Sequence, residues 1–331
     1  MENKNVIEVK NLKKMFKIPN KEFMEKASFF KKLFFRKYDE FWALKGISFS
    51  LKEGEILGYI GRNGAGKTTT IKILTGILEP TEGDVKVLGY NPYKERKKVS
   101  FYTSVLFANR SYALEIPIKD TLKYYAAMYG FSWKDIEDWA EVLIQMLNME
   151  ELMNIPGRKL SFGQRRKLDL LIALINKPKI LFLDELTIGL DIFTKEEIRD
   201  FLLKINRKEK ISIFMTTHYM EDIEKLADRI ILIDQGKLIW EGKLEDLIKK
   251  VNYKKIEILT KNPKATFEKA KKLDITGLEL DKNKITFFID REKIFEIREL
   301  IDNNIIDIKV DSPSLEDLIK DLYEKLNIRQ N

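Results

Sequence analysis

The chain has 331 residues, of which 44% are hydrophobic and 34% are charged, a composition that supports one or two folded domains and argues against disorder. It contains no cysteine and one histidine, which excludes disulfides, thiolate metal sites, a cysteine nucleophile and multi-histidine metal sites. The net charge is +8, and residues 10–37 alone hold ten basic and two acidic residues, so the excess is local and no nucleic-acid partner is expected.

The N-terminus lacks an apolar signal core, so export of the protein is not expected. No apolar run exceeds six residues, so no membrane span is expected.

The first part of the chain predicts strands that lead into a glycine-rich turn. Residues 6–16 alternate like an edge strand. Residues 43–61 predict two short strands joined at Glu53-Gly54, and a helix is predicted from Thr68 to Thr75.

Basic and aromatic residues are interleaved in an inserted segment, residues 18–41. If residues 22–41 form a helix, one face gathers Phe23, Phe30, Phe34 and Phe41. Such a basic amphipathic helix suits an anionic membrane surface or a membrane permease subunit. The competing interpretation is a helix folded back over the protein core with its lysines in water, and these alternatives stay open.

The middle of the chain alternates helices and apolar strands. Helical spacing covers residues 118–149 and 167–175, and buried strands are predicted at 180–183, 211–215 and 229–234. Alternation of this kind predicts an α/β sheet with a nucleotide bound at the carboxyl ends of its strands.

A second unit is predicted from residue 250 to residue 331, with the β-α-β-β-α-β order of ferredoxin-like domains. Its predicted elements are strand 255–260, helix 264–272, strands 276–280 and 284–290, helix 291–301 and strand 305–310. A last helix, 314–326, starts with a cap from Ser314 and Asp317. The unit is either a small-molecule regulatory domain or a dimerisation support. The second is favoured because no cluster of ligand-binding residues is visible.

Residues 61–68 fit the phosphate-binding pattern G-x-x-x-x-G-K-[ST]. Glycines allow the backbone to wrap with its N–H groups toward phosphate oxygens, and the following helix N-terminus adds positive potential. We expect Lys67 to reach the β- and γ-phosphates and Thr68 to ligate Mg²⁺. The candidate ATP contacts are Gly61, Asn63, Gly64, Ala65, Gly66, Lys67, Thr68 and Thr69.

Two acids follow the strand 180–183. Asp184 is expected to hold Mg²⁺, and Glu185 to orient or deprotonate the attacking water. Taken alone, acids at a strand end are usually only solvated, and the phosphate loop in the same chain reverses that preference. Ser161 precedes a predicted helix and by itself indicates an N-cap, although an exposed helix N-terminus also suits a phosphate held by another subunit.

The order of these motifs resembles the nucleotide-binding subunit of ATP-binding cassette (ABC) transporters. Residues 160–164, LSFGQ, are similar to the family signature LSGGQ, and the D-loop 189–191 and the switch His218 follow in the family's order. The basic insert, the sequence FANR at 107–110 and the C-terminal unit are similar to ATPase subunits of type-2 ABC exporters.

The resemblance implies an α/β fold, a P-loop NTPase cassette at residues 1–245 with a mixed sheet and a helical subdomain. Within it, residues 105–175 would form the Q-loop and the helical, signature-bearing subdomain. A ferredoxin-like α+β domain would occupy residues 250–331.

The resemblance also implies an ATPase subunit that binds Mg-ATP in a head-to-tail dimer, as a homodimer or beside a paired ATPase subunit. It would drive an exporter through separate transmembrane permease subunits, from a peripheral position on the cytoplasmic face of the cell membrane. The alternative is a non-transport ABC switch on the ribosome or on nucleic acid. That is less favoured because the chain has one cassette, no heptad run and a local basic excess.

Family roles carry over to matching positions. Glu185, His218 and Lys67 would be catalytic. Across the dimer, Ser161 and Gly163 would contact the γ-phosphate of the ATP bound to the partner, and Gln164 would be a further nucleotide contact. Asp191 would contact the partner subunit.

Adenine stacking is expected from Phe16, with core packing as its competing role and with Tyr38 or Trp42 as substitutes. Three positions depart from the family pattern. Asn109 stands where the Q-loop glutamine, a Mg²⁺ ligand, is usual; Phe162 replaces a signature glycine; and Leu186 replaces a proline. These departures put the turnover rate in question and leave ATP binding intact.

Overall fold

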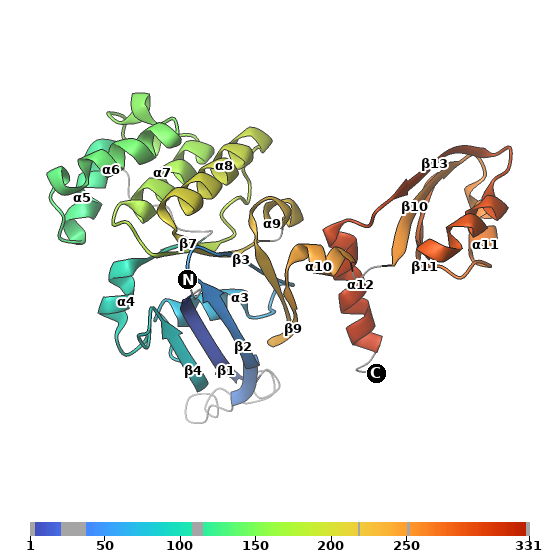
Figure 1. The fold of residues 1–331 in the computed structure, drawn as a ribbon, viewed down its shortest axis with the longest axis horizontal. Coiled ribbons are helices and arrows are strands. Elements are labelled where there is room, and N and C mark those ends of the chain that lie inside the picture. The colour runs from blue at the N-terminus through green and yellow to red at the C-terminus, as the bar shows by residue number, and fades with distance from the viewer. Residues whose placement is uncertain (1–3, 21–37, 108–114, 218, 250–251, 329–331) are drawn as a thin grey trace, which may run out of the picture. The chain divides into compact units, whose positions relative to one another are not determined.

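The computed structural model describes residues 4–20, 38–107, 115–217, 219–249 and 252–328. The chain divides into two compact units, residues 1–242 and 243–331, and each is described by itself (Figure 1).

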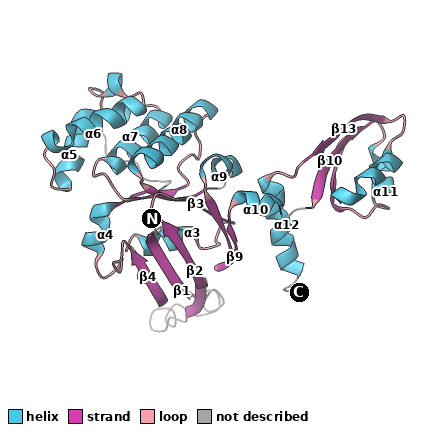
Figure 2. Ribbon diagram, in the orientation of Figure 1, coloured by secondary structure: helices cyan, strands magenta, loops and turns pink. Residues whose placement is uncertain are grey.

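A six-stranded sheet in the order β5-β6-β7-β3-β8-β9 forms the centre of the first unit. Its strands β3 and β9 are labelled in Figure 2. Its strands are β3 (Ile56–Gly61), β5 (Thr103–Leu106), β6 (Ile180–Asp184), β7 (Ser212–Thr216), β8 (Arg229–Asp234) and β9 (Lys237–Gly242). All pairs are parallel except β8–β9. Every residue of β3, β6 and β7 is buried, which explains their continuous apolar sequences. After β3 the chain passes to the edge strand β5, returns through β6 and β7 to one side of β3, and then continues on its other side with β8 and β9. A crevice is expected at the carboxyl end of β3, where the connections divide to the two sides.

A second, antiparallel sheet has the order β2-β1-β4. It contains β1 (Asn5–Pro19), β2 (Tyr38–Lys52) and β4 (Glu82–Val87). The helix considered for residues 22–41 is wrong for its last four residues, because 38–41 belong to β2 and pair with β1. Cross-strand hydrogen bonding to β1 decides their conformation, and helical spacing in the sequence does not reveal it. The remaining candidates of that helix face, Phe23, Phe30 and Phe34, lie outside the described residues.

Helices α5 (Ile118–Met128), α6 (Trp133–Met146), α7 (Phe162–Leu174) and α8 (Ile192–Glu209) gather on one side of the six-stranded sheet (Figure 1). The remaining helices of this unit are α3 (Lys67–Leu74), α4 (Arg96–Tyr102) and α9 (Met220–Leu226), with 3-10 turns at Glu150–Leu152 and Gly157–Lys159. The helical stretch predicted at 118–149 is two helices, because the chain turns at Gly130, whose φ is +84°, and restarts at the Ser132 capping box.

The core of the first unit joins both sheets. Phe49 from the antiparallel sheet packs against Tyr59 and Phe214 of the parallel sheet, with ring centroids 5.7 and 6.0 Å away. Phe182 continues the cluster at 5.9 Å from Phe214. This shared core fixes the antiparallel sheet against the strand that leads into the glycine-rich turn.

The second unit carries a four-stranded antiparallel sheet in the order β11-β12-β10-β13. Its strands are β10 (Tyr253–Thr260), β11 (Thr276–Asp281), β12 (Lys284–Asp290) and β13 (Ile305–Asp311), and its helices are α10 (Leu244–Lys249), α11 (Pro263–Ala270), the 3-10 helix η3 (Arg291–Leu300) and α12 (Leu315–Ile328). The predicted βαββαβ order is confirmed, with a 3-10 helix as its second helical element. The Ser314 cap is also confirmed, since the Ser314 Oγ accepts from the Asp317 N–H at 3.2 Å.

Candidate functional site

The glycine-rich turn joins β3 to α3 in the conformation that the sequence predicts. Gly64 and Gly66 have φ of +79° and +110°, in the left-handed region. A Cβ on Gly66 would lie 2.8 Å from the Ala43 carbonyl oxygen and 2.7 Å from the Leu44 side chain. Glycine is therefore required there, because both the backbone angle and the neighbouring strand exclude a side chain.

Lys67 is 6% exposed and starts α3. Its Nζ donates to the Gly61 carbonyl at 2.7 Å and to the Arg62 carbonyl at 3.3 Å. Burial lowers the pKa of Lys67, while the carboxylates of Glu185 and Asp184 oppose that shift. The loop's own carbonyls thus hold a cation directly beside the turn where phosphate oxygens would lie.

Asp184 ends β6 and is 7% exposed. The Thr68 hydroxyl donates to Asp184 Oδ2 at 3.3 Å, and the Thr216 hydroxyl donates to Oδ1 at 2.6 Å. Among the residues that the structure describes, no group of three or more His, Cys, Asp or Glu side chains forms a metal site. The pair of a hydroxyl and one carboxylate fits Mg²⁺, which completes its shell with waters and phosphate oxygens.

A cavity of about 230 Å³ opens beside the turn. It brings together most of the predicted ATP contacts with Glu185, and its lining is Phe16, Phe41, Ala43, Asn63, Gly64, Gly66, Lys67, Thr68, Thr69 and Glu185. Glu185 has φ of 56°, and its N–H donates to the Thr216 carbonyl at 3.0 Å, so the strand end turns sharply at this carboxylate. Of the predicted contacts, Gly61 and Ala65 lie in the loop itself and outside this lining.

Two aromatic residues also line this cavity. Phe16 of β1 lines it as predicted, and so does Phe41 of β2, which is its direct cross-strand partner. The sequence prediction misses Phe41 because cross-strand pairing joins residues far apart in the chain. Its proposed substitutes, Tyr38 and Trp42, pair with Pro19 and Met15 and are absent from the lining.

The predicted signature begins α7. The Ser161 Oγ accepts from the Gln164 N–H at 3.2 Å, and Gln164 Oε1 accepts from the Ser161 N–H at 2.9 Å, which forms a capping box. Phe162 is 51% exposed, with Arg166 stacked over its ring at 5.5 Å. Gln164 therefore has a structural role in addition to the nucleotide contact predicted for it.

The predicted D-loop lies against the signature. Asp191 caps α8 by accepting from the Thr194 N–H at 3.0 Å and from the Thr194 hydroxyl at 2.7 Å, and these bonds lower the pKa of Asp191. A Cβ on Gly163 would meet the Thr194 side chain at 3.0 Å. The signature and the D-loop thus form one surface. No residue of either motif is among the residues that line the phosphate cavity.

A buried polar cluster behind Glu185 was not predicted. Asp222 of α9 is 1% exposed and accepts from Arg199 Nε at 2.7 Å. Its other oxygen accepts from Thr187, two residues after Glu185, and from Thr217. The cluster fastens the loop after Glu185 to the segment after β7. Only the fold brings these elements together, so no local sequence signal reveals it.

Two predicted site residues, His218 and Asn109, lie outside the described residues. Thr217, one residue before His218, is 2% exposed and held by Asp222, and β5 ends at Leu106, three residues before Asn109.

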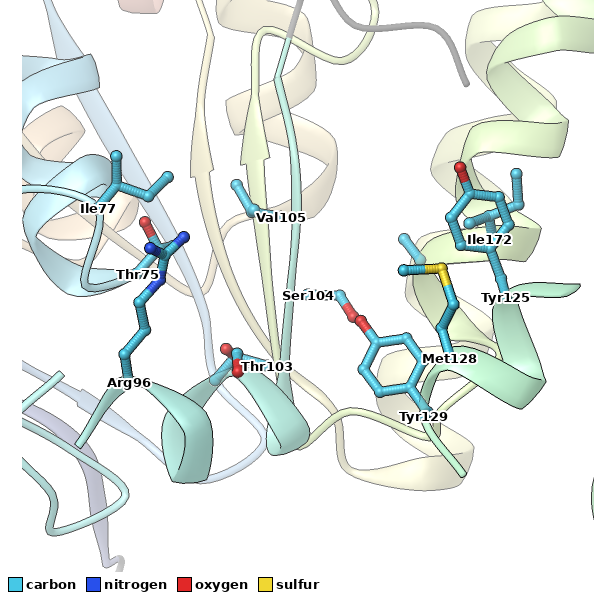
Figure 3. Close-up of a pocket in the computed structure, with 12 residues that line it drawn as sticks. Thr75, Ile77, Arg96, Thr103, Ser104, Val105, Tyr125, Met128, Tyr129 and Ile172 are labelled. Atoms are coloured by element: carbon cyan, nitrogen blue, oxygen red, sulfur yellow. The ribbon is translucent and has the colours of Figure 1, made fainter. Parts of the chain in front are cut away.

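A second cavity of about 330 Å³ lies between the sheet and the helices (Figure 3). Arg96 of α4 and Thr75 form one wall, and Tyr125, Met128 and Tyr129, from α5 and its C-terminal end, form the other. Met128 is 66% exposed at its rim. The Tyr129 hydroxyl bonds Ser104, and burial raises the pKa of Tyr129.

Comparison with known proteins identifies the family. A family profile described as "ABC transporter" matches residues 44–188. The bacitracin transport ATP-binding protein BcrA of Bacillus licheniformis is 31% identical over 282 residues, which cover 85% of this chain and 90% of that protein. The chain belongs to the ABC transporter ATP-binding family.

Other ABC ATPases agree with this assignment. The ATP-binding protein NatA of Bacillus subtilis is 34% identical over 206 residues, which cover 62% of this chain and 83% of NatA. The dimeric ABC transporter cassette MJ0796 shares the fold, with a TM-score of 0.59, 24% identity and coverage of 72% of this chain and 98% of that chain. This ABC ATPase is therefore an ATP-binding subunit that hydrolyses ATP to ADP and phosphate in a transport system. In the described part of the ABC ATPase, no helix is long and apolar enough to cross a membrane.

Proposed function

We propose that this ABC ATPase powers a membrane exporter from the cytoplasmic face of the cell membrane. The observation that carries the proposal is the cavity that unites the phosphate turn, the Glu185 carboxylate and two aromatic rings. It provides, in one place, groups suited to the three parts of ATP hydrolysis: adenine stacking, phosphate binding and activation of water.

In the proposed reaction, Phe16 and Phe41 hold adenine, and the backbone N–H groups of the turn bind the phosphates. Thr68 and Asp184 would hold Mg²⁺, with Asn109 as a further ligand, and the bound ion would supply positive charge against the phosphates. Glu185 orients the attacking water and accepts its proton. Lys67 and His218 stabilise the negative charge on the phosphoryl group during transfer.

We infer that two cassettes act head to tail. Signature and D-loop form one surface away from the chain's own phosphate cavity, so a second cassette is needed to bring them to a nucleotide. Ser161 and Gly163, at the start of α7, would then bind the γ-phosphate of the partner. Asp191 would contact the partner subunit, and the MJ0796 cassette supplies the precedent for a dimer.

Coupling to a separate permease is proposed at the second cavity. Its apolar rim side chains, including Met128 and Ile77, are exposed, and Ser104 and Val105 in its floor belong to β5. β5 pairs with β6, the strand that ends at Asp184. A permease segment seated there would therefore contact the sheet one strand away from the reacting phosphate.

The export direction rests on the relatives. BcrA is named for bacitracin transport, and LnrL of Bacillus subtilis, 33% identical over 204 residues that cover 62% of this chain and 65% of LnrL, is named for linearmycin resistance. A compound of the kind that these two names print, bacitracin or linearmycin, is accordingly the substrate that we propose.

The test uses the full chain with Glu185→Gln. We expect steady-state ATPase activity to fall at least 100-fold, because the water loses its base, while ATP still binds. Light scattering should then show monomers becoming dimers, or dimers closing into a smaller form, only when ATP and Mg²⁺ are present. Glu268→Gln, an exposed carboxylate in the second unit, is the matched control and should leave hydrolysis unchanged. Undiminished hydrolysis in Glu185→Gln would refute the assigned base.

A further inference from the structure

Strand β13 forms one edge of the sheet in the second unit. Its side chains Ile306 and Val310 are 52% and 45% exposed, although both are apolar. An edge strand with exposed apolar side chains presents unpaired backbone groups that a further strand can join. Ile308, between them, packs partly against the core of this unit.

The sequence of β13 is complementary to itself. If two copies pair antiparallel with Ile308 opposite Ile308, then Ile306 faces Val310 and Asp307 faces Lys309, twice each. Opposite charges and apolar pairs at directly facing positions stabilise antiparallel strands. If Asp307 or Lys309 instead faced its own copy, like charges would lie opposite each other. If the second strand were shifted by one residue, the apolar residues of each strand would lie opposite charged residues of the other.

The charged positions of β13, Asp307 and Lys309, are exposed to solvent. Lys309 forms a 2.7 Å ion pair with Asp311, yet its side chain stays 65% exposed. Asp307 is exposed and lies opposite Leu259 of β10, so no like charge faces it across the strand pair. Lys309 also lies opposite Glu257 of β10, and both charged side chains are exposed on the edge strand that a second β13 would join.

The other edge of the sheet lacks this complementarity. β11 has a register irregularity between Thr276 and Glu279 and a left-handed Gly277, with φ of +61°. An irregularity of this kind disturbs pairing locally. β13 also has one, at Ile306 between its pairs with Leu259 and Thr260, but its pairing with β10 is regular from Asp307 to Asp311. Pairing β11 with its copy about Glu279 would set two carboxylates face to face, and Glu279 already bonds Lys320 of α12 at 2.6 Å.

We propose that two copies of this chain join through their β13 edges, antiparallel about a two-fold axis at Ile308, into one continuous sheet. The contact is isologous, as closed two-fold dimers require. It needs no nucleotide and thus goes beyond the proposed ATP-dependent cassette dimer. It would keep two cassettes together after ATP has been hydrolysed.

Cysteine cross-linking tests the register, because the natural chain has no cysteine. Facing residues of antiparallel strands have Cα atoms about 4.5–5.5 Å apart, within disulfide reach. In the full chain without nucleotide and with EDTA, Ile308→Cys should form a covalent dimer on mild oxidation. Ile306→Cys and Val310→Cys should not cross-link alone, since each lies about 13 Å from its own copy at 3.3 Å per residue. A mixture of these two variants should cross-link.

The matched control is Leu280→Cys on β11, which is 41% exposed and should stay monomeric on the same gel. The Ile306 and Val310 mixture keeps the test valid if Ile308→Cys loosens the core. Equal cross-linking of Leu280→Cys, or self-linking of Ile306→Cys without mixed linking, would overturn the proposal. Glu185→Gln can fail to dimerise with ATP while these cross-links form, or the reverse, so the two proposals fail separately.

Discussion

At the scale of single residues, Asp222 joins three buried side chains outside the phosphate cavity. It neutralises Arg199, which is 2% exposed, and accepts hydrogen bonds from Thr187 and Thr217. Leu186 stands where the family usually has proline, so ring rigidity does not hold this turn. The Thr187–Asp222 bond supplies a tether in its place, two residues from Glu185.

Asp222→Asn removes the charge that pairs with buried Arg199. We expect the free energy of unfolding to fall by about 3 kcal/mol, since a buried guanidinium loses its counter-charge. We also expect kcat for ATP hydrolysis to fall about tenfold with KM changed less than threefold, because Glu185 is displaced while the binding cavity persists. Urea unfolding and steady-state kinetics measure the two effects.

Glu221→Gln is the control at the neighbouring residue. Glu221 also bonds Arg199, at 2.9 Å, but its side chain is 60% exposed. Solvent screens such a pair, so a loss of less than about 1 kcal/mol and unchanged kcat are expected. Equal effects of both variants would show that Asp222 does not act on the Glu185 loop.

At the scale of elements, the hairpin of β1 and β2 decides which rings meet the nucleotide. The pairing of Phe16 with Phe41 places both at one wall of the cavity, and Lys14 lies 5.2 Å from the Phe16 ring. Helical reasoning about residues 22–41 could not find Phe41 as a binding residue, because its position depends on strand register.

Phe16→Ala and Phe41→Ala should each weaken ATP binding by about twofold to twelvefold, as aromatic stacking contributes about 0.5–1.5 kcal/mol. Fluorescent ATP titration of the full chain measures this. Tyr38→Ala, on the same strand but outside the cavity lining, is the control and should bind ATP as the unmodified chain does. Equal weakening in all three variants would mean that the hairpin, and not its rings, determines affinity.

At the scale of the whole molecule, the two units have separate cores. One is built around Phe49, Tyr59 and Phe214, and the other around Ile256, Ile285 and Phe287. Separate cores unfold separately unless a large apolar interface joins them. The phosphate cavity belongs entirely to the first unit.

We therefore expect calorimetry of the full chain to show two transitions, with ATP and Mg²⁺ raising only the transition of the first unit. Phe287→Ala removes a fully buried ring and should lower only the other transition, by an amount that corresponds to about 3–5 kcal/mol. A single transition that moves with both ATP and Phe287→Ala would show that the units unfold together.

The sequence by itself determined the features that depend on neighbours in the chain. The spacing of Gly64, Gly66 and Lys67 specified the phosphate turn, because the left-handed backbone angles at both glycines are ones that other residues rarely adopt. Apolar runs specified β3, β6 and β7, since fully buried strands need no alternation. The βαββαβ order followed from local patterns in the same way.

Only the tertiary structure decided the contacts that close across long sequence distances. Strand register set Phe41 beside Phe16, and helix packing brought Thr187, Arg199 and Asp222 together. It also set β11 and β13 at the two edges of the second sheet, since all four strands are similar short strands in the sequence. Such contacts depend on which segments pack together. The local sequence around a charged residue, an aromatic residue or a strand does not show which distant residue it will contact.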